Sequence, residues 1–448
     1  MKKYDSYKDS GIEWIHEIPN HWNESRLKYL FSFGKGLSIT KENLVDKGIP
    51  CVNYGEIHSK CGFKVNPEID TLKCVPEEYL NKSINALLTN GDFVFADTSE
   101  DIEGSGNFTH LDGNINVFAG YHTVVMKPSQ IINSRFFAYQ FDSLEFRSQI
   151  RSSVKGIKVL SITQSILKNC SIWIPSIPEQ TAIANFLDHK TAQIDDLVRK
   201  KERLIELLKE ERTAIINQAV TKGLHPNVPM KDSGIEWLGE IPEHWEVWKI
   251  SHAFPNIGSG TTPESGNPVY HENGTINWLN TGNLNDGFLQ SCSKKITEKA
   301  REDYSSLKIY PPGSLVIAMY GATIGKTAIV DFETTTNQAC CVFCKGEIID
   351  LKFLQYWFKA KKEHIISLSV GGGQPNISQQ ILKDIRLGAP SLDEQIQVVE
   401  YLEVKDNFFS MLENKLENEI ELLKEYKTTL VSEVVTGKVD VRVEKLNG

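Results

Sequence analysis

The sequence lacks any apolar run near the roughly 20 residues that a membrane-spanning helix needs, although 40% of its residues are hydrophobic. Its start, MKKYDSYKDSGIEW, has no apolar core and is not expected to be a signal peptide. Its eight cysteines do not show the paired spacing of a disulfide framework. We interpret them as reduced thiols, and we expect a cytoplasmic protein of two or three domains.

An excess of positive charge is also lacking, because the net charge of the chain is −9. The acidity is concentrated near the C-terminus, where residues 393–440 hold 12 acidic and 5 basic side chains, a balance of −7. Residues 23–160 hold 15 basic and 16 acidic side chains, and residues 246–376 hold 12 of each. A basic face can exist within such a nearly neutral segment, so nucleic-acid binding is not excluded.

Two long amphipathic helices are predicted, one central and one C-terminal. Residues 179–222 carry apolar side chains in steps of three, four and seven, and no Pro or Gly interrupts them. Shifting this segment by 215 positions aligns it with residues 394–437, so that Glu179 and Gln180 fall on Glu394 and Gln395. Helices of this length need a partner to cover their apolar stripe, and we expect the two to pack together. The expected packing residues are Leu187, Ile194, Leu197, Leu204, Leu208, Leu402, Phe409, Leu412, Leu416 and Leu423.

A second repeat precedes each globular stretch. Residues 9–22 read DSGIEWIHEIPNHW and residues 232–245 read DSGIEWLGEIPEHW, which agree at 11 of 14 positions. The tryptophans of this repeat are expected to act in packing. Because both repeats flank globular stretches that differ in sequence, the chain is predicted to consist of two half-units with the same scaffold and different modules. Short β-rich runs separated by Gly and Asn predict mixed sheets with exposed loops in each module.

Catalytic motifs are missing. We find no HExxH, nucleophile elbow, helicase-type ATP site or adenine-methyltransferase signature. The segment GATIGKT at residues 321–327 resembles a phosphate-binding loop but has three residues between its glycines instead of four, so a turn facing a DNA backbone is favoured. The CxxC at residues 341–344 has no second pair, which favours core thiols over a zinc site.

Polar residues in the predicted loops are the remaining functional candidates. Their side chains have the donors and acceptors that read base edges or bind phosphates, although each one taken alone is also a common turn former or cap. They are Lys35, Ser38, Asn53, Tyr54, Thr261, Thr262, Asn280, Asn283, Tyr320, Thr323, Lys326, Asn337 and Gln338. The glycine-rich segment GGGQPN at residues 371–376 is predicted to be either a flexible loop near the ligand or an ordinary hinge.

The whole chain resembles the DNA-specificity subunits of type I restriction–modification systems. The motifs that carry the resemblance are IPSIPEQTAIANFLDHKTAQIDDL at residues 174–197, APSLDEQ at 389–395, SGIEWLGEIPEHW at 233–245, and MYGATIGK at 319–326 with TNQ at 336–338. The first module has no clear counterpart of MYGATIGK. The resemblance implies an α+β fold with two mixed α/β target-recognition domains, separated by two long helices packed as an antiparallel coiled coil.

The resemblance also implies a role and a domain plan. Each module would read half of a bipartite site in double-stranded DNA, and the helices would set the spacer and dock two methyltransferase subunits; two motor–nuclease subunits could join. The chain itself would be non-catalytic, with no cofactor of its own and S-adenosylmethionine on the methyltransferase. The segments are a lead-in arm at 1–22, recognition domain 1 at 23–173, the central helix at 174–224, a second arm at 225–245, recognition domain 2 at 246–388, the C-terminal helix at 389–440 and a tail at 441–448.

Two alternatives are retained at this point. The first is a fused methyltransferase or nuclease enzyme, which would need a cofactor loop that we do not find. The second is a coiled-coil scaffold protein whose two modules do not bind DNA.

Overall fold

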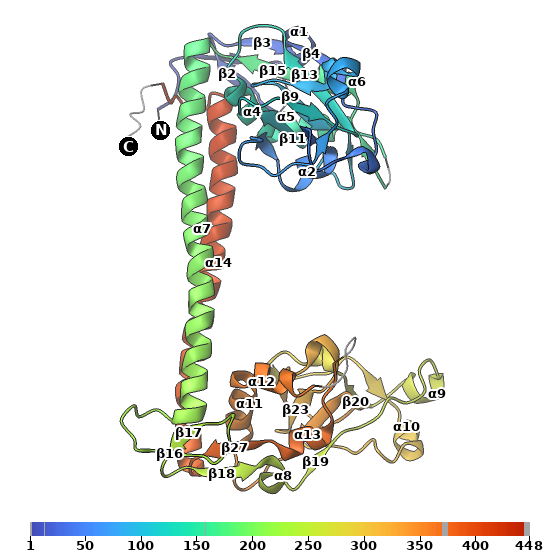
Figure 1. Ribbon diagram of the computed structural model, residues 1–448, viewed down its shortest axis with the longest axis vertical. Coiled ribbons are helices and arrows are strands. Elements are labelled where there is room, and N and C mark those ends of the chain that lie inside the picture. Colours follow the sequence, from blue (N-terminus) through green and yellow to red (C-terminus); the bar gives the residue numbers. More distant parts are fainter. Residues whose placement is uncertain (1, 13, 157, 370–374, 443–448) are drawn as a thin grey trace. The chain divides into compact units, whose positions relative to one another are not determined.

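In the computed structural model, residues 2–12, 14–156, 158–369 and 375–442 are described, and they form two compact units (Figure 1). Unit 1 comprises residues 1–201 with 418–448, and unit 2 comprises residues 202–417. Each unit holds one globular module and part of each long helix. The division therefore passes through the helices, whereas the sequence analysis treated each helix as a segment of its own.

The largest sheet of unit 1 has five strands in the order β4-β13-β9-β11-β6. Its last pair, β11 and β6, is parallel, and the other neighbours are antiparallel. The strands are β4 (Phe31–Lys35), β13 (Thr123–Pro128), β9 (Phe93–Ala96), β11 (Phe108–Leu111) and β6 (Phe63–Val65). All four residues of strand β9 are buried.

A second sheet in unit 1 follows the order β7-β5-β12-β8, with β5 and β12 parallel. Its strands are β7 (Cys74–Val75), β5 (Ile49–Val52), β12 (Val117–Ala119) and β8 (Leu87–Leu88). The other elements are β1 (Tyr7–Asp9), β2 (Glu17–Pro19), β3 (Asn23–Arg26), β10 (Thr98–Ser99), β14 (Leu160–Ser161), β15 (Ser171–Ile174), α1 (Leu27–Leu30), α2 (Tyr54–Ser59), α3 (Tyr79–Lys82), α4 (Ser134–Asp142), α5 (Leu144–Arg151), α6 (Gln164–Asn169), η1 (Lys41–Asn43) and η2 (Ile84–Ala86).

Unit 2 repeats the five-stranded sheet and, with one strand fewer, the smaller sheet. Its five-stranded sheet follows β19-β26-β23-β24-β21, and its smaller sheet follows β22-β20-β25. The parallel pairs, β21 with β24 and β20 with β25, occupy the places of β6 with β11 and β5 with β12. Two modules that share little sequence therefore share one topology, because buried strands tolerate many apolar residues if the alternating pattern is kept.

The bounds of the unit 2 elements follow the chain. They are β16 (Met230–Asp232), β17 (Glu240–Pro242), β18 (Glu246–Lys249), α8 (Ile250–Ala253), β19 (Ile257–Gly258), α9 (Pro268–His271), β20 (Ile276–Leu279), η3 (Thr281–Asn283), β21 (Gly287–Leu289), β22 (Lys295–Ile296), α10 (Glu298–Asp303), β23 (Leu315–Ala318), η4 (Gly321–Thr323), β24 (Thr327–Val330), β25 (Thr334–Thr336), β26 (Cys340–Phe343), α11 (Leu351–Ala360), α12 (Lys362–Ser367), α13 (Gln379–Asp384) and β27 (Arg386–Ala389).

The repeated lead-in forms a short hairpin in each unit, β1 with β2 and β16 with β17. The second tryptophan of each copy, Trp22 or Trp245, is completely buried behind the hairpin. The first tryptophans differ, because Trp14 is 41% exposed while Trp237 stacks on His364 at 4.1 Å between ring centroids. Packing therefore accounts for Trp22, Trp237 and Trp245, and Trp14 lies on the surface.

The two long helices are α7 (Ile177–Lys222) and α14 (Leu392–Val435), and they pack side by side in opposite directions. In unit 1, Asp195 of α7 pairs with Lys427 of α14 at 2.7 Å, and Lys201 pairs with Glu419 at 2.5 Å. In unit 2, Arg212 pairs with Asp406 at 2.9 Å. Partner numbers fall as α7 numbers rise, which is the antiparallel arrangement that the fold prediction stated.

The seam between these helices corrects part of the predicted packing set. Leu187, Ile194, Leu402 and Phe409 are buried, and Leu208, Leu412, Leu416 and Leu423 are partly buried. Leu197 and Leu204, however, are 42% and 44% exposed. Their places in the seam are taken by Val198, which packs against the core of unit 1, and by Ile205, which is 8% exposed. Apolar residues stand at both adjacent positions, so periodicity alone did not decide which stripe faces the partner helix.

No helix within the described ranges is both long and apolar enough to cross a bilayer.

Candidate nucleic-acid interface

Three loops of module 2 meet at one edge of its sheets. They are residues 280–283 after β20, residues 320–326 between β23 and β24, and residues 337–339 between β25 and β26. The backbone N–H of Asn337 donates to the Leu279 carbonyl at 2.9 Å, and the N–H of Met319 donates to the Ala339 carbonyl at 2.8 Å. These bonds hold the loops together because β20 and β25 are parallel neighbours whose C-terminal ends coincide.

The predicted asparagines of module 2 shape these loops with their carbonyl oxygens. Asn280 caps η3 by accepting from the Gly282 N–H at 3.1 Å, and Asn283 accepts from the Asn280 N–H at 3.0 Å. Asn337 accepts from the Ala339 N–H at 3.2 Å. The amide N–H groups of these three side chains have no partner among the described residues. Each of these asparagine side chains is therefore held in place by its carbonyl oxygen, and its amide N–H donors stay available to a ligand.

The segment after β19 brings two predicted threonines, Thr261 and Thr262, beside Gln338. The Thr262 hydroxyl donates to Gln338 Oε1 at 2.7 Å, and the Thr261 carbonyl accepts from the Trp278 indole N–H at 3.1 Å. A Cβ at Gly260 would lie 1.8 Å from the Thr336 carbonyl oxygen, so only glycine allows the backbone at residue 260 to pass this close to the end of β25. Gln338 is exposed with its amide nitrogen directed to no protein partner in the described part of the chain.

Loop 320–326 presents Tyr320, which is 43% exposed, and the partly exposed Lys326. The Thr323 hydroxyl is used inside the loop, where it donates to the Tyr320 carbonyl at 2.9 Å. The loop joins strand β23 to strand β24 through η4, and a phosphate-binding loop would instead lead into a helix whose N-terminus faces the phosphate. This connection differs from that of a phosphate-binding loop, and the DNA-facing turn stays a prediction. Of the predicted segment GGGQPN, residues 371–374 lie outside the described residues.

Module 1 places its own loops at the same edge. Asn53 caps α2, its side-chain oxygen lies 3.3 Å from the Tyr121 N–H, and its backbone N–H donates to Glu56 at 3.0 Å. Asn53 is completely buried, so it positions the loop instead of facing a ligand. Tyr54 is partly buried, with its ring 5.3 Å from the His122 ring.

The counterpart of the MYGATIGK segment in module 1 is the loop between β9 and β11. This loop and α2 enclose a cavity of about 800 Å³. His58 fixes the loop, because its two ring nitrogens lie 2.8 Å from the Thr98 carbonyl and 2.9 Å from the Asn107 amide. Sequence reasoning missed His58, His122 and Asn107, as well as the exposed Glu100 and Glu103. These residues are found through the strand order that the two modules share, because it shows that the loop between β9 and β11 corresponds to the loop between β23 and β24.

The remaining predicted residues of module 1, Lys35 and Ser38, lie at the edge of its larger sheet. Both are exposed and line a groove of about 620 Å³ that also contains Lys82 and Lys127. The Leu37 N–H donates to the Ala119 carbonyl at 2.8 Å, which places this segment beside the loop that carries Tyr121. The groove has the lysines that a phosphate backbone would meet.

Throughout the described ranges, no group of three or more His, Cys, Asp and Glu side chains is arranged to hold a metal ion. Cys340 and Cys341 lie in the buried strand β26, and burial raises the pKa of each thiol to about 12. Of the CxxC, Cys341 is therefore a core thiol, whereas Cys344 is only partly buried.

Comparisons with known proteins converge on one family. The model of the family "Type I restriction modification DNA specificity domain" matches residues 19–207 and 242–422. The MjaVIII specificity subunit of a type I restriction enzyme from Methanocaldococcus jannaschii is 28% identical over 69% of this chain and 71% of its own length. A putative type I restriction enzyme MjaX specificity subunit from the same organism is 24% identical over 97% of this chain and 98% of its own length.

Solved structures show the same fold. The HsdS subunit from Thermoanaerobacter tengcongensis aligns with a TM-score of 0.58 at 15% identity and covers 94% of this chain and 98% of its own. A chain from a study of complex assembly and conformational transition of the type I R-M system aligns with a TM-score of 0.71 at 15% identity, over 94% of this chain and 99% of that one.

Proposed function

The chain belongs to the type I restriction–modification DNA specificity family, and from this membership we propose that it is the subunit that selects the DNA sequence of such a complex. Each module reads one half of a bipartite site in double-stranded DNA. The observation that carries this proposal is the shared topology of two modules whose loops at the same edge carry different polar side chains. A common scaffold with different contact residues suits two unlike half-sites.

The side chains at these loops divide into two kinds of contact. Lys326 in module 2 and Lys35 in module 1 are suited to phosphate oxygens, which position a protein on DNA without reading its sequence. The amide N–H groups of Asn280, Asn337 and Gln338 are suited to acceptor atoms on base edges, because the protein contacts of these side chains use only their carbonyl oxygens. We propose that these amides and their neighbours set the sequence preference of module 2.

The outer face of α14 is the proposed docking surface for methyltransferase subunits. Within unit 2 it exposes Val404 at 68%, Phe408 at 49% and Met411 at 59%. These residues follow helical spacing, so they form one apolar stripe that a partner helix would cover. Acidic side chains of α14 differ in exposure. Glu413 is 16% exposed and lies 3.8 Å from Arg212 in the seam, whereas Glu417 and Glu421 are exposed.

Catalysis is assigned to the partners. The proposed complex contains two methyltransferase subunits, which hold S-adenosylmethionine and modify the base, and it can include two motor–nuclease subunits. The chain itself then needs no cofactor and works in the cytoplasm, where the DNA and these partners are.

Mapping methylated adenines across the genome tests the proposal directly. Deleting this chain should abolish methylation at one bipartite motif, and exchanging module 1 (residues 23–173) for that of a relative should change one half of the motif and leave the other intact. An unchanged methylome after deletion would refute the proposed function, and a change in both halves would refute the assignment of one half-site to each module.

A further inference from the structure

One segment of module 1, residues 155–156 and 158–161, is attached to the edge where the loops after β5, β9 and β12 meet (the reading edge). Strand β14 of this segment pairs antiparallel with β10, which follows β9. The N–H of Ile162 donates to the Asp97 carbonyl at 2.8 Å, and the N–H of Asp97 donates to the His122 carbonyl at 3.0 Å. The segment therefore extends the reading edge of module 1.

Module 2 attaches the corresponding segment in the same way. The N–H of Ile377 donates to the Met319 carbonyl at 2.8 Å, and Asn376 forms an antiparallel bridge with Tyr320. Residues 371–374, which precede this bridge, lie outside the described residues, and their sequence GGGQ contains no lysine. Both modules thus place a segment beside the loop after their central strand, and the segment of module 1 is the one that carries lysines.

The segment of module 1 folds back on itself through a tight turn. Lys155 forms an antiparallel bridge with Ser161, whose N–H donates to the Lys155 carbonyl at 3.3 Å. A Cβ at Gly156 would lie 2.0 Å from the Val159 carbonyl oxygen, so only glycine allows the chain to turn this closely. The side chains of Lys155, Lys158 and Val159 are exposed. The turn therefore presents two ammonium groups to solvent at the reading edge.

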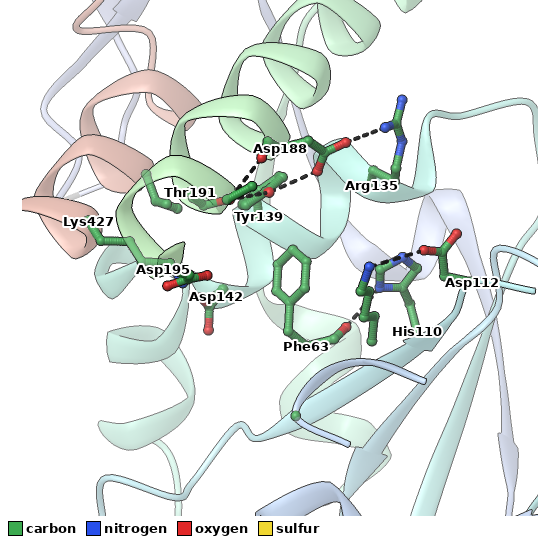
Figure 2. A pocket seen from close by; sticks show the side chains of 14 residues that line it. Phe63, His110, Asp112, Arg135, Tyr139, Asp142, Asp188, Thr191, Asp195 and Lys427 are labelled. Carbon is green, nitrogen blue, oxygen red and sulfur yellow. Dashed lines mark hydrogen bonds and ion pairs between the residues drawn. The ribbon is translucent and has the colours of Figure 1, made fainter. Parts of the chain in front are cut away.

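These two ammonium groups are free of protein anions. Among the described residues, neither Lys155 nor Lys158 has an ion-pair or hydrogen-bond partner for its side chain. The cavity where module 1 meets α7 and α14 within unit 1 is different, because each lysine and arginine that lines it is paired with a carboxylate (Figure 2). The pairs are Arg135 with Asp188, Lys64 with Asp112 and Lys427 with Asp195. The turn at the reading edge thus keeps positive charge available to a ligand.

Negative charge gathers beside the turn, in the cavity of about 800 Å³ that Val159 helps to line. The carboxylates that line it are Glu100, Asp101 and Glu103. Two guanidinium groups reach the same loop, because Arg151 donates to the Glu103 carbonyl at 2.7 Å and Arg147 donates to Asn107 at 2.7 Å. Arg147 is also paired with Asp142 at 2.8 Å. A DNA backbone at this edge is therefore attracted to the lysines of the turn and repelled from the cavity.

We propose that Lys155 and Lys158 bind phosphate groups of the half-site that module 1 reads. A lysine ammonium suits phosphate oxygens because it is a compact charge with three donors and no acceptor. Contacts of this kind position a protein on DNA without reading its sequence. The inference rests on the proposed function, because it assumes that module 1 meets DNA with its reading edge.

Fluorescence anisotropy of the assembled complex at several salt concentrations tests the inference, on a duplex that carries the mapped methylation motif. The double variant Lys155→Gln/Lys158→Gln should reduce the slope of log K against log salt by about 1.8, since each phosphate contact contributes about 0.9. Its Kd should rise by about tenfold at physiological salt, on the motif and on unrelated DNA alike. Lys155→Arg/Lys158→Arg keeps both charges and should bind like wild type.

A matched control makes the same change of net charge elsewhere in module 1. Lys28 and Lys47 are exposed and precede β4 and β5, whose other ends lie at the reading edge. Lys28→Gln/Lys47→Gln should therefore keep the wild-type slope. Equal reductions of the slope in the two double variants would overturn the inference, because they would show an effect of net charge alone.

Lysine acetylation followed by mass spectrometry locates the contact. Motif DNA should protect Lys155 and Lys158 in the assembled complex and leave Lys28 and Lys47 reactive. Absence of either result, the reduced slope or the protection, overturns the inference while the complex still binds its motif. A wild-type complex that prefers no DNA sequence would instead refute the proposed function, and the inference with it.

Discussion

Gln395 accepts a hydrogen bond of 2.8 Å from the backbone N–H of Asp350, the residue that caps α11. Its amide nitrogen donates to the carbonyls of Ile348 and Pro390, each at 2.9 Å. Gln180 does the same in unit 1, where it accepts from Asn133 and donates to Pro175, both at 2.9 Å. The repeated Glu–Gln pair at the start of each long helix therefore ties that helix to its own module.

Gln395→Leu should destabilise unit 2 by about 2 to 4 kcal/mol, because it leaves three backbone groups unpaired around a completely buried position. Urea unfolding followed by circular dichroism measures the loss. Gln380→Leu is the control, since Gln380 is exposed and bonds only Asp384 of its own helix; it should stay within about 0.5 kcal/mol of wild type. Equal effects of the two variants would contradict this role of Gln395.

Arg212→Met should weaken the helix pair by about 2 kcal/mol. The substitution leaves Asp406 and Glu413, each 16% exposed, without the guanidinium that neutralises them. The triple variant Arg212→Met/Asp406→Asn/Glu413→Gln should recover most of the loss, because no buried charge then remains unpaired. Thermal unfolding of wild type, the single variant and the triple variant measures these losses. A triple variant no more stable than Arg212→Met would contradict the role of Arg212 in neutralising Asp406 and Glu413.

Stability should fall in alkaline solution through the buried thiols. Burial raises the pKa of Cys51, Cys170, Cys340 and Cys341 to about 12, whereas an unfolded thiol titrates near about 8.5. The folded state holds these protons more tightly, so this stabilisation is complete below about pH 8.5 and is lost as pH rises toward 12. Unfolding free energies at pH 7, 9 and 10.5 measure the decline, and Cys340→Ala should make it shallower.

The same thiols should resist alkylation in the folded protein. At pH 8, iodoacetamide should label the partly exposed Cys344 first and label all eight cysteines only in denaturant. Mass spectrometry of the peptides reports the order, and early labelling of Cys340 in native protein would show that its burial is wrong.

Lys326→Ala should weaken the assembled complex on every DNA sequence and reduce the salt dependence of binding by about one unit of slope. Gln338→Leu should instead change the preference for one base in one half-site. The discrimination against the wrong base should fall by about 1–3 kcal/mol. Lys345→Ala is the control, because Lys345 follows the opposite end of β26 from Gln338. Fluorescence anisotropy at several salt concentrations separates these outcomes, and identical effects of Lys326→Ala and Lys345→Ala would exclude Lys326 from the interface.

Phe408→Glu should abolish methyltransferase binding without loss of folding, because Phe408 is 49% exposed on the outer stripe of α14. Phe409→Glu, one position away, should instead unfold the helix pair, since Phe409 is 3% exposed. Analytical ultracentrifugation with the partner and circular dichroism of the isolated chain distinguish the two. Normal assembly by Phe408→Glu would remove this stripe as the docking surface.

The sequence by itself determined the scaffold, because its signals are local or repeated. Helical periodicity without Pro or Gly predicted α7 and α14, and the Trp22 and Trp245 repeat marked the lead-in of each module. Only the tertiary structure decided which of two adjacent apolar stripes faces the partner helix, so that Ile205 is buried and Leu204 is not. It also decided the loop partners, because strands distant in sequence bring His58 to Asn107 and Ile162 to Asp97. Contacts of that kind depend on strand pairing across tens of residues, which no local pattern records.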